Sequence, residues 1–216
     1  MPISYAPAGK TGKWDGAMDW LQMLSGICLI LFVWCHAFLE SSVIISPELL
    51  NTIGHFLEAT GMVQVGGPLI FLVFLAHFVL AARKIPFRFE AQASIWHQAK
   101  MLRHGDTWTW IVQAASAMII LIMAAIHMWV ALSDLPITAA KSAARIQSGG
   151  WSIFFLFLLV LTHVHVGAGL YRIGVKWGFV KDTERAVFLK TVTMIVFGFI
   201  GLGLITLGRY FFMSVN

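Results

Sequence analysis

The amino-acid sequence predicts an all-α polytopic membrane protein in which five transmembrane helices form a single integral membrane domain over residues 1–216. Hydrophobic residues make up 59% of the chain and charged residues only 12%, proportions typical of membrane-embedded proteins. Long apolar stretches recur along the chain, with basic residues concentrated between them. No aromatic and basic pattern typical of a nucleic-acid surface is present, so we expect no nucleic-acid partner.

The five predicted spans are the stretches that approach the length needed to cross a bilayer, about 20 predominantly apolar residues. One of them is slightly short. Each has Trp, Tyr, Lys or Arg near at least one end, where such side chains anchor a helix at the membrane surface. The predicted spans are residues 19–45, 66–82, 108–132, 151–175 and 188–213.

The link between the first two spans, residues 46–61, has the signature of a short helix on the membrane surface. Ser46 can accept a hydrogen bond as its N-cap, and Pro47 suits the first helical position. Gly61 can end the helix, and an apolar stripe runs along one face. Glu58 lies near the end of this helix.

The distribution of basic residues predicts the orientation in the membrane. Of the 15 Lys and Arg residues, only Lys141, Arg145 and Arg209 lie on one side of the predicted spans. Basic loops stay in the cytoplasm, so we expect a multi-pass membrane protein with a cytoplasmic N-terminus and an outside C-terminus. The polar first 17 residues do not have the pattern of a removable signal peptide.

Five of the eight histidines lie within predicted spans. Ionisable side chains inside a membrane are costly, and they usually face the interior of the bundle with a partner. The histidines in question are His36, His77, His127, His163 and His165.

Depth in the membrane sorts four of these histidines into two pairs. His36 and His127 lie about 17 and 19 residues from the inner ends of their spans, roughly 25–28 Å at 1.5 Å per residue. His77 and His165 lie six and seven residues before the next basic residue, so about 10 Å below the cytoplasmic surface. We therefore predict an outer pair and an inner pair, separated by roughly 15 Å.

Two imidazoles that face each other across a helical bundle suit bis-histidine ligation of a haem iron, and two stacked sites suit electron transfer through the membrane. Covalent haem attachment is excluded because the chain has no C-x-x-C-H motif. Zinc is an alternative, but it prefers four ligands, and we find no Cys or carboxylate at either level. A proton relay or transport bundle is another alternative, although Asp and Glu are nearly absent from the spans.

Helix geometry distinguishes His163 from His165. Residues two apart on a helix point roughly 200° away from each other, so both cannot address one site. The face of His165 continues with Ala168, Gly169 and Arg172, small residues that admit a flat macrocycle and a base that can meet its propionates. The face of His163 is bulkier, so we predict His165 as the ligand. Helix packing is the alternative role of the small residues.

The chain resembles the di-haem cytochrome b subunit of quinol:fumarate reductases, the type with one five-helix chain and two b haems. Succinate:menaquinone reductase anchors share this architecture. The resemblance runs in family order across nearly the whole chain. It is carried by "DWLQ", "WCHAF", "FLAHFVLAARKIP", "RHGDTWTWIVQ", "IHMWV" and "HVGAGLYRIGVKWG".

The resemblance implies ligands for two haem irons. It implies His36 and His127 as ligands of the outer haem iron, and His77 and His165 as ligands of the inner one. These are the pairs that depth predicts. Positions that hold a haem propionate in the family are matched by Gln22, Trp110 and Lys176, for which interfacial anchoring is the alternative role.

The resemblance also implies that Glu58 takes part in menaquinol oxidation near the outer haem. Quinol oxidation releases two protons, and a carboxylate at the outer interface can accept one as a general base. An ordinary solvated carboxylate is the alternative. His55, one turn earlier, is a weaker candidate for the same proton exit.

One position departs from the family pattern. Some members have a glutamate two residues before the inner-haem ligand, linked to proton movement that compensates transmembrane electron flow, and this chain has His163 there. The departure puts a carboxylate route in doubt. His163 either substitutes as a titratable relay or the compensation is absent.

We therefore expect the membrane anchor and electron-transfer subunit of a quinol:fumarate reductase complex. It would oxidise menaquinol and pass electrons through two haem b groups to an iron–sulfur subunit and, beyond it, a flavoprotein that reduces fumarate to succinate. The chain has no flavin fingerprint and no iron–sulfur cysteine set, so these partners are separate polypeptides. The basic loop around "RKIPFRF" and "KMLRHGD" is the expected docking surface.

Several alternatives stay open. The same architecture can run in the opposite direction as a succinate:menaquinone reductase. A haem-free membrane transporter or anchor with buried histidines belongs to another class. Besides membrane lipid and quinol, a second copy of the complex is a possible partner, in a dimer.

Overall fold

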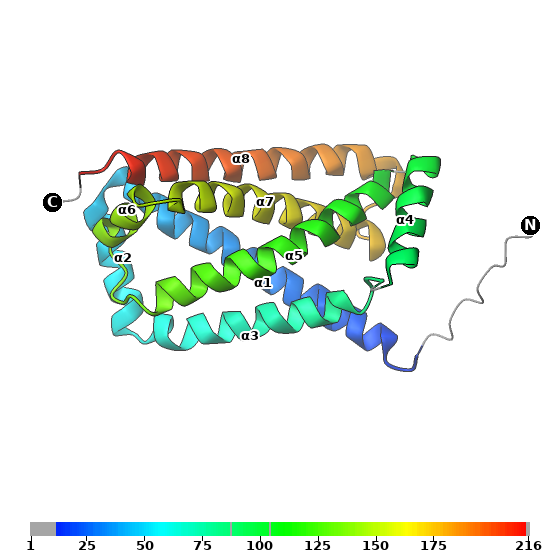
Figure 1. Cartoon of the computed structure of the whole chain (residues 1–216), viewed down its shortest axis with the longest axis horizontal. Coiled ribbons are helices and arrows are strands. Elements are labelled where there is room, and N and C mark those ends of the chain that lie inside the picture. Colours follow the sequence, from blue (N-terminus) through cyan, green and yellow to red (C-terminus); the bar gives the residue numbers. More distant parts are fainter. Residues whose placement is uncertain (1–11, 87, 104, 215–216) are drawn as a thin grey trace, which may run out of the picture.

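Five long helices run side by side along the longest axis of the molecule (Figure 1). The computed structural model describes residues 12–86, 88–103 and 105–214. Each long helix has the length and apolar composition of a membrane span, and together they confirm the predicted all-α fold class. They are α1 (Asp15–Ile45), α3 (Met62–Ala82), α5 (Gly105–Leu132), α7 (Trp151–Lys176) and α8 (Arg185–Phe211).

The predicted surface helix is α2 (Pro47–Ala59). Its N-cap is Ser46, whose hydroxyl accepts a hydrogen bond from the backbone N–H of Leu49 at 3.1 Å. Just beyond its C-terminal end Gly61 has a φ of 73°, a left-handed conformation that glycine adopts without strain. The helix therefore begins after Ser46 and ends before Gly61, as the sequence predicts.

Three shorter elements lie where the sequence analysis predicts no helix. They are α4 (Phe89–Leu102), α6 (Ala139–Gln147) and a 3₁₀ turn, η1 (Asp182–Glu184). The helix α4 lies across one end of the bundle, and α6 lies beside α2 at the other end (Figure 1). The hydroxyl of Thr138 caps α6 by accepting from the backbone N–H of Lys141.

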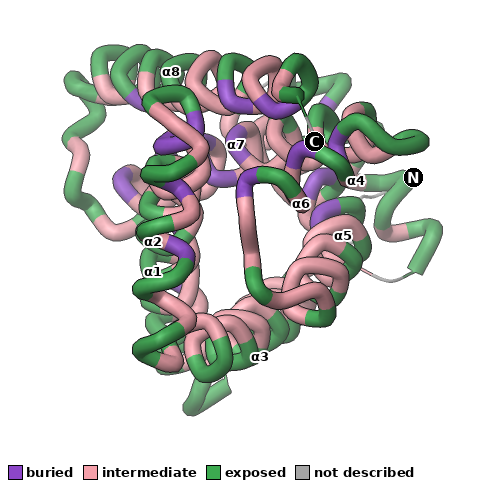
Figure 2. The backbone as a smooth tube through the Cα atoms, turned by 90° about the vertical axis from the view of Figure 1, so that its left-hand side faces the viewer, coloured by how far each residue is buried: buried purple, intermediate pink, exposed green. Residues whose placement is uncertain are grey.

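A view along the bundle axis shows how the long helices are arranged (Figure 2). Helices α1, α3, α5 and α7 surround the centre, and α8 packs outside them against α7 and α1. Glycines let α7 and α8 approach closely, since a Cβ added at Gly167 would come within 2.5 Å of the side chain of Val196.

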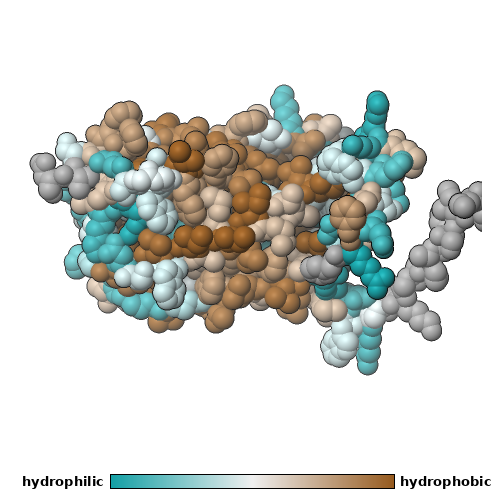
Figure 3. Space-filling view, in the orientation of Figure 1, coloured by the Kyte–Doolittle hydropathy of each residue, from teal (hydrophilic) through white to brown (hydrophobic). Residues whose placement is uncertain are grey.

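Apolar side chains cover the outside of the bundle between two more polar ends (Figure 3). Many large apolar residues are exposed there, among them Leu72, Val79 and Phe197 at 62%, 67% and 68%. A continuous apolar belt of this kind marks the surface that a lipid bilayer covers.

A tightly packed core lies at the end of the bundle where α2, α6 and the C-terminal part of α8 meet. Its members are the buried side chains of Val43, Leu50, Ala139, Ala143, Ile146 and Tyr210. We call this the α2–α6 end. We call the other end, where α1 begins and α7 ends, the basic end, because Arg83, Lys84 and Lys176 lie there.

Candidate functional site

A single continuous cavity runs along the inside of the bundle from one end to the other. Near the basic end its lining includes Asp19 and Lys176, and near the α2–α6 end it includes Glu40 and Tyr210. All five histidines predicted within spans are also among its lining residues: His36, His77, His127, His163 and His165.

The outer pair of histidines meets across this cavity. The ring of His36 on α1 and the ring of His127 on α5 have centroids 6.0 Å apart and planes inclined at 50°. A metal ion held between two imidazoles lies about 2 Å from each ligating nitrogen, which brings the ring centroids to about 6 Å apart. Phe32 stacks on His36 at 5.7 Å, and Phe155 packs edge-on against His127 at 5.4 Å. The aromatic contacts hold both rings at a spacing that accommodates one metal ion.

The ring of His165 is oriented by α5. Its Nδ1 lies 3.0 Å from the backbone carbonyl oxygen of Gln113 and 3.2 Å from the hydroxyl of Ser116. A carbonyl oxygen can only accept, so Nδ1 carries the hydrogen and donates it. The lone pair is therefore on Nε2, the arrangement found in metal-binding histidines whose other nitrogen is hydrogen-bonded.

The ring of His77 is oriented in the same way by α1. Its Nδ1 lies 3.0 Å from the hydroxyl oxygen of Ser25, and that hydroxyl donates its own hydrogen to the carbonyl of Leu21. The Ser25 oxygen therefore accepts from Nδ1, which leaves the lone pair of His77 on Nε2. Gly26 makes room for the ring, because a Cβ there would lie 3.1 Å from its Cε1 atom. The side chains of His77 and His165 both line the central cavity.

His163 faces α8, on the side of α7 that the helix-face argument predicts. Its ring stacks on Phe199 at 5.7 Å, and its Nδ1 donates to the carbonyl of Leu159 at 2.8 Å. The residue is only 4% exposed, and its Nε2 is buried with no hydrogen-bond partner. Its environment therefore differs from that of His165.

The described residues contain no cluster of three or more His, Cys, Asp or Glu side chains that could hold a metal ion. A zinc site with four protein ligands is therefore not built there. Two opposed imidazoles, as in the outer pair, instead suit an iron whose remaining ligands come from a macrocycle. The donor set fits haem.

The four residues predicted to hold propionates all line the cavity near the basic end. The side-chain oxygen of Gln22 is buried there without a hydrogen-bond partner, and Trp110 lies close to Arg172. Arg172 donates to the side-chain oxygen of Gln113 at 2.5 Å. Lys176 donates to Asp19 at 2.5 Å. Cationic and unsatisfied polar groups at this level suit the carboxylates of a haem.

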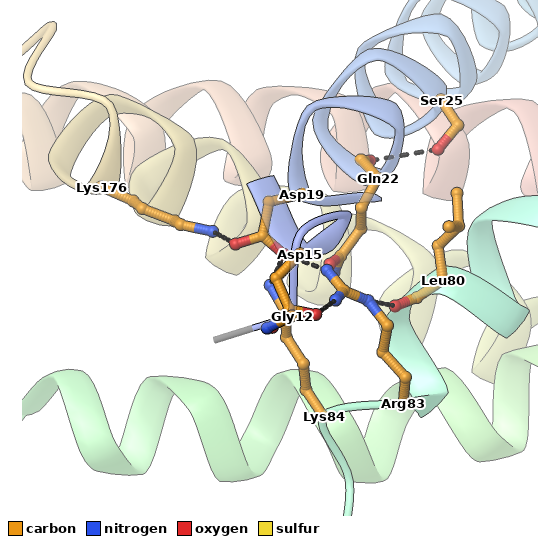
Figure 4. A network of polar contacts seen from close by, with 9 residues as sticks. All are labelled: Gly12, Asp15, Asp19, Gln22, Ser25, Leu80, Arg83, Lys84 and Lys176. Carbon is orange, nitrogen blue, oxygen red and sulfur yellow. Dashed lines mark hydrogen bonds and ion pairs between the residues drawn. The ribbon is translucent and has the colours of Figure 1, made fainter. Parts of the chain in front are cut away.

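Asp19 joins three helices at this end of the cavity, and the sequence analysis did not single it out (Figure 4). Its carboxylate pairs with Lys176 of α7, with Lys84 at 2.6 Å and with Arg83, the last two just after α3. Partial burial lowers the pKa of Lys84, and the hydrogen bond to Asp19 opposes that shift. The network keeps two lysines beside the cavity.

Glu58 is held against the turn between α5 and α6. Its Oε1 accepts a hydrogen bond from the backbone N–H of Ile137 at 2.6 Å, and Asn51 accepts one from the N–H of Ala139 at 2.8 Å. Glu58 is half-buried and is not among the residues that line the cavity, whereas Ile137 is. The exposed His55 lies one turn earlier on α2. Glu58 is therefore neither freely solvated nor directly inside the cavity.

Further ionisable residues line the cavity near the α2–α6 end, and the sequence analysis gave Glu40, Lys141 and Arg145 no role in a site. Glu40 follows His36 by one helical turn, and Lys141 and Arg145 lie on α6. Both bases bind Asp134, and the hydrogen bond from Lys141 holds the pKa of that carboxyl below its usual range. A signal for Glu40 was present, since it is an acid within the first predicted span.

Known proteins are similar to this chain over most of its length. A family model described as "Succinate dehydrogenase/Fumarate reductase transmembrane subunit" matches residues 90–205. The fumarate reductase cytochrome b subunits of two Helicobacter pylori strains are 32% identical over 218 residues, covering 95% of this chain and 86% of each relative. The corresponding subunit of Wolinella succinogenes is 29% identical over 217 residues, covering 94% and 85%. The similarity extends well beyond the histidine-bearing segments.

Proposed function

Because this chain belongs to the family of succinate dehydrogenase and fumarate reductase transmembrane subunits, we propose that it oxidises menaquinol and passes the electrons through two bis-histidine b haems. The chain is a membrane cytochrome b subunit of that family. Electrons would leave at the basic end to an iron–sulfur subunit, and a flavoprotein beyond it would reduce fumarate to succinate.

The observation that carries this proposal is the 6.0 Å spacing of the His36 and His127 rings across the cavity. Both residues come from apolar helices, where unpaired ionisable groups are costly. A haem bound between them supplies one-electron chemistry at its iron. The protein fixes the ring positions and excludes water by surrounding them with aromatic side chains.

The inner site draws support from the hydrogen bonds of its histidines. His77 and His165 each donate through Nδ1 and so present the lone pair of Nε2. Near the same level, Gln22, Arg172 and Lys176 offer polar groups that suit propionates, together with Trp110.

Quinol oxidation is proposed at the α2–α6 end, with Glu58 as the proton acceptor. The N–H of Ile137 donates to Oε1 of Glu58 and fixes its position beside a turn that also lines the cavity. One proton from the quinol would pass to this carboxylate and then to the solution outside, with His55 as a secondary group on the exit route.

The orientation follows from the same charge asymmetry that the sequence has. We propose that the basic end is cytoplasmic and that the protein lies in the bacterial inner membrane. The iron–sulfur subunit would dock on the loop that contains Arg88, Lys100 and Arg103. Lys10, Phe87 and His104, which belong to the predicted charge pattern or docking segments, lie outside the described residues. Dimer formation by the whole complex is also compatible with this arrangement.

A haem count tests the proposal. Pyridine haemochrome analysis of the purified chain should give two b haems per polypeptide. Alanine at His36 or His127 should remove only the outer signal, and alanine at His77 or His165 only the inner one. His163→Ala is the matched control, and it should retain both signals because His163 packs against α8.

The complementary measurement uses the assembled complex with menaquinol as donor and fumarate as acceptor. Glu58→Gln should abolish most of the turnover and leave both haem signals in place. A protein without haem would refute the proposal in favour of a haem-free transporter or anchor. Faster succinate oxidation than fumarate reduction would identify the reverse direction.

A further inference from the structure

Glu40 is a carboxylate on a membrane-spanning helix and has no part in the function proposed above. It lies four residues after His36 on α1, a rise of about 6 Å along the same face of the helix. Both residues line the central cavity. An ionisable group within a membrane span is expensive and marks a functional site more often than a packing role.

The position of Glu40 is defined by Tyr210 of α8. The phenol hydroxyl of Tyr210 donates to Oε2 of Glu40 at 2.7 Å, and Tyr210 is only 2% exposed. The backbone at Tyr210 is held in turn, because the side chain of Gln147 donates to its carbonyl at 2.8 Å. Beside this pair, Ser41 and Thr206 exchange a hydrogen bond of 3.0 Å between α1 and α8. Glu40 thus lies in a polar layer.

Charged groups at the α2–α6 end line the same cavity as Glu40. Helix α6 contributes Lys141 and Arg145, which line the same cavity, and the turn before α6 contributes Asp134. Lys141 and Arg145 both form ion pairs with Asp134, at 3.0 Å and 2.6 Å respectively. The titratable groups on the other side are those of the outer histidine pair. Among the carboxylates of the described cavity lining, Asp19 and Asp134 are in ion pairs with basic residues, whereas Glu40 has the Tyr210 hydroxyl as its partner.

We propose that Glu40 binds a proton when the outer haem gains an electron and releases it when the electron moves on. The inference rests on the function proposed above, because it needs a haem between His36 and His127. Quinol oxidation supplies two electrons and two protons. The electrons would pass one at a time, and for each electron held at the outer site one proton would convert the Glu40 carboxylate to a carboxylic acid, so the charge added near the pair would be neutralised. The proton leaves toward the α2–α6 end after the electron has passed to the inner haem.

A purely structural role for Glu40 is the competing explanation, since its carboxylate accepts the Tyr210 hydrogen bond. The two roles are separable. The Glu40→Gln variant keeps an oxygen that can accept from Tyr210 and has nearly the same volume, but it cannot take up a proton near neutral pH. A structural role predicts that the pH dependence of the outer potential stays the same in this variant, and proton uptake predicts that it becomes flatter.

The test measures the midpoint potentials of both haems between pH 5 and 9 in the purified complex. In the natural protein the outer potential should fall as pH rises. In Glu40→Gln this dependence should flatten and the outer potential should become higher, because a negative charge is lost beside the iron. The inner haem is the internal reference and should keep its own pH dependence. Glu58→Gln is the matched control, which should lower menaquinol oxidation but leave the slope of the outer potential unchanged.

A second measurement guards against a variant that assembles poorly. The reduced-minus-oxidised infrared spectrum should contain a carboxylic acid C=O band that is absent from Glu40→Gln. Tyr210→Phe, which keeps the carboxyl but removes its donor, should retain the band with an altered position. An unchanged outer slope in Glu40→Gln with both haems present overturns this inference alone. A natural protein without an outer haem overturns the proposed function, and the inference with it.

Discussion

The carboxylate of Glu58 accepts a hydrogen bond from the backbone N–H of Ile137 at 2.6 Å, which ties helix α2 to the turn that precedes α6. The contact depends on a close approach of the two segments at Gly54, where an added Cβ would lie 3.2 Å from the carbonyl oxygen of Ile137. A larger residue in place of Gly54 would therefore move α2 relative to the turn and shift Glu58 with it.

Gly54→Ala should push α2 away from the turn and lengthen the Glu58 hydrogen bond. Backbone atoms cannot rotate away as a flexible side chain can, so we expect a destabilisation of about 1–3 kcal/mol, reduced in part by the better helix propensity of Ala. Menaquinol oxidation should fall several-fold with both haem signals retained. Gly66→Ala is the control, because nothing lies within 4 Å of its added Cβ. Equal activity of the two variants would show that the position of Glu58 does not matter.

The hydroxyl of Ser25 should matter for the inner haem. Ser25→Ala removes the acceptor of the His77 Nδ1–H, so the ring loses its fixed orientation. Losing such a partner of a metal-binding histidine typically lowers metal affinity about 10–100-fold. Haem titration of the apoprotein should reveal weaker binding at the inner site alone. Ser41→Ala, which removes hydrogen bonds to Thr206 and to the carbonyl of Ala37 but none to His77, should leave inner-site binding unaltered.

The proximity of His36 and His127 was predictable because straight helices and a fixed membrane normal turn sequence position into depth. His36 and His127 are far apart in sequence, yet the same count along each span predicts that they meet. The surface helix α2 was predictable for a similar reason, since Ser46, Pro47 and Gly61 act within a few residues of each other.

Contacts between helices were not predictable in this way. The groups that orient the inner histidines, Ser25 and the carbonyl of Gln113, lie on other helices and depend on rotation about each helix axis. The helix α6 was missed because a search for long apolar runs passes over nine residues. Glu40 was missed because a single acid does not interrupt a span.

The ion pairs of Asp134 should make the α2–α6 end sensitive to acid. Hydrogen bonding to Lys141 lowers the pKa of Asp134 in the folded protein. A carboxyl with a depressed folded pKa contributes stability above its unfolded value, about 4, and that contribution is lost as pH falls through the folded value. Hydrogen-exchange protection of the α6 amides should therefore drop below about pH 4 in the natural protein. In Asp134→Asn the α6 amides should be less protected from hydrogen exchange than in the natural protein already at neutral pH. Asp182→Asn, at the basic end, should leave α6 unaffected.

The close packing of α7 on α8 can be tested by filling and then restoring space at one contact. A Cβ at Gly167 would lie 2.5 Å from Cγ2 of Val196, and a β-branched side chain cannot rotate far on a helix. Gly167→Ala should therefore lower stability by about 1–3 kcal/mol in thermal or detergent unfolding. Val196→Ala in the same chain should recover most of that loss by vacating the space. Gly201→Ala, whose added Cβ would have no atom within 4 Å, should not lower the stability. Additive losses in the double variant, with no recovery, would mean that the two residues do not share this contact.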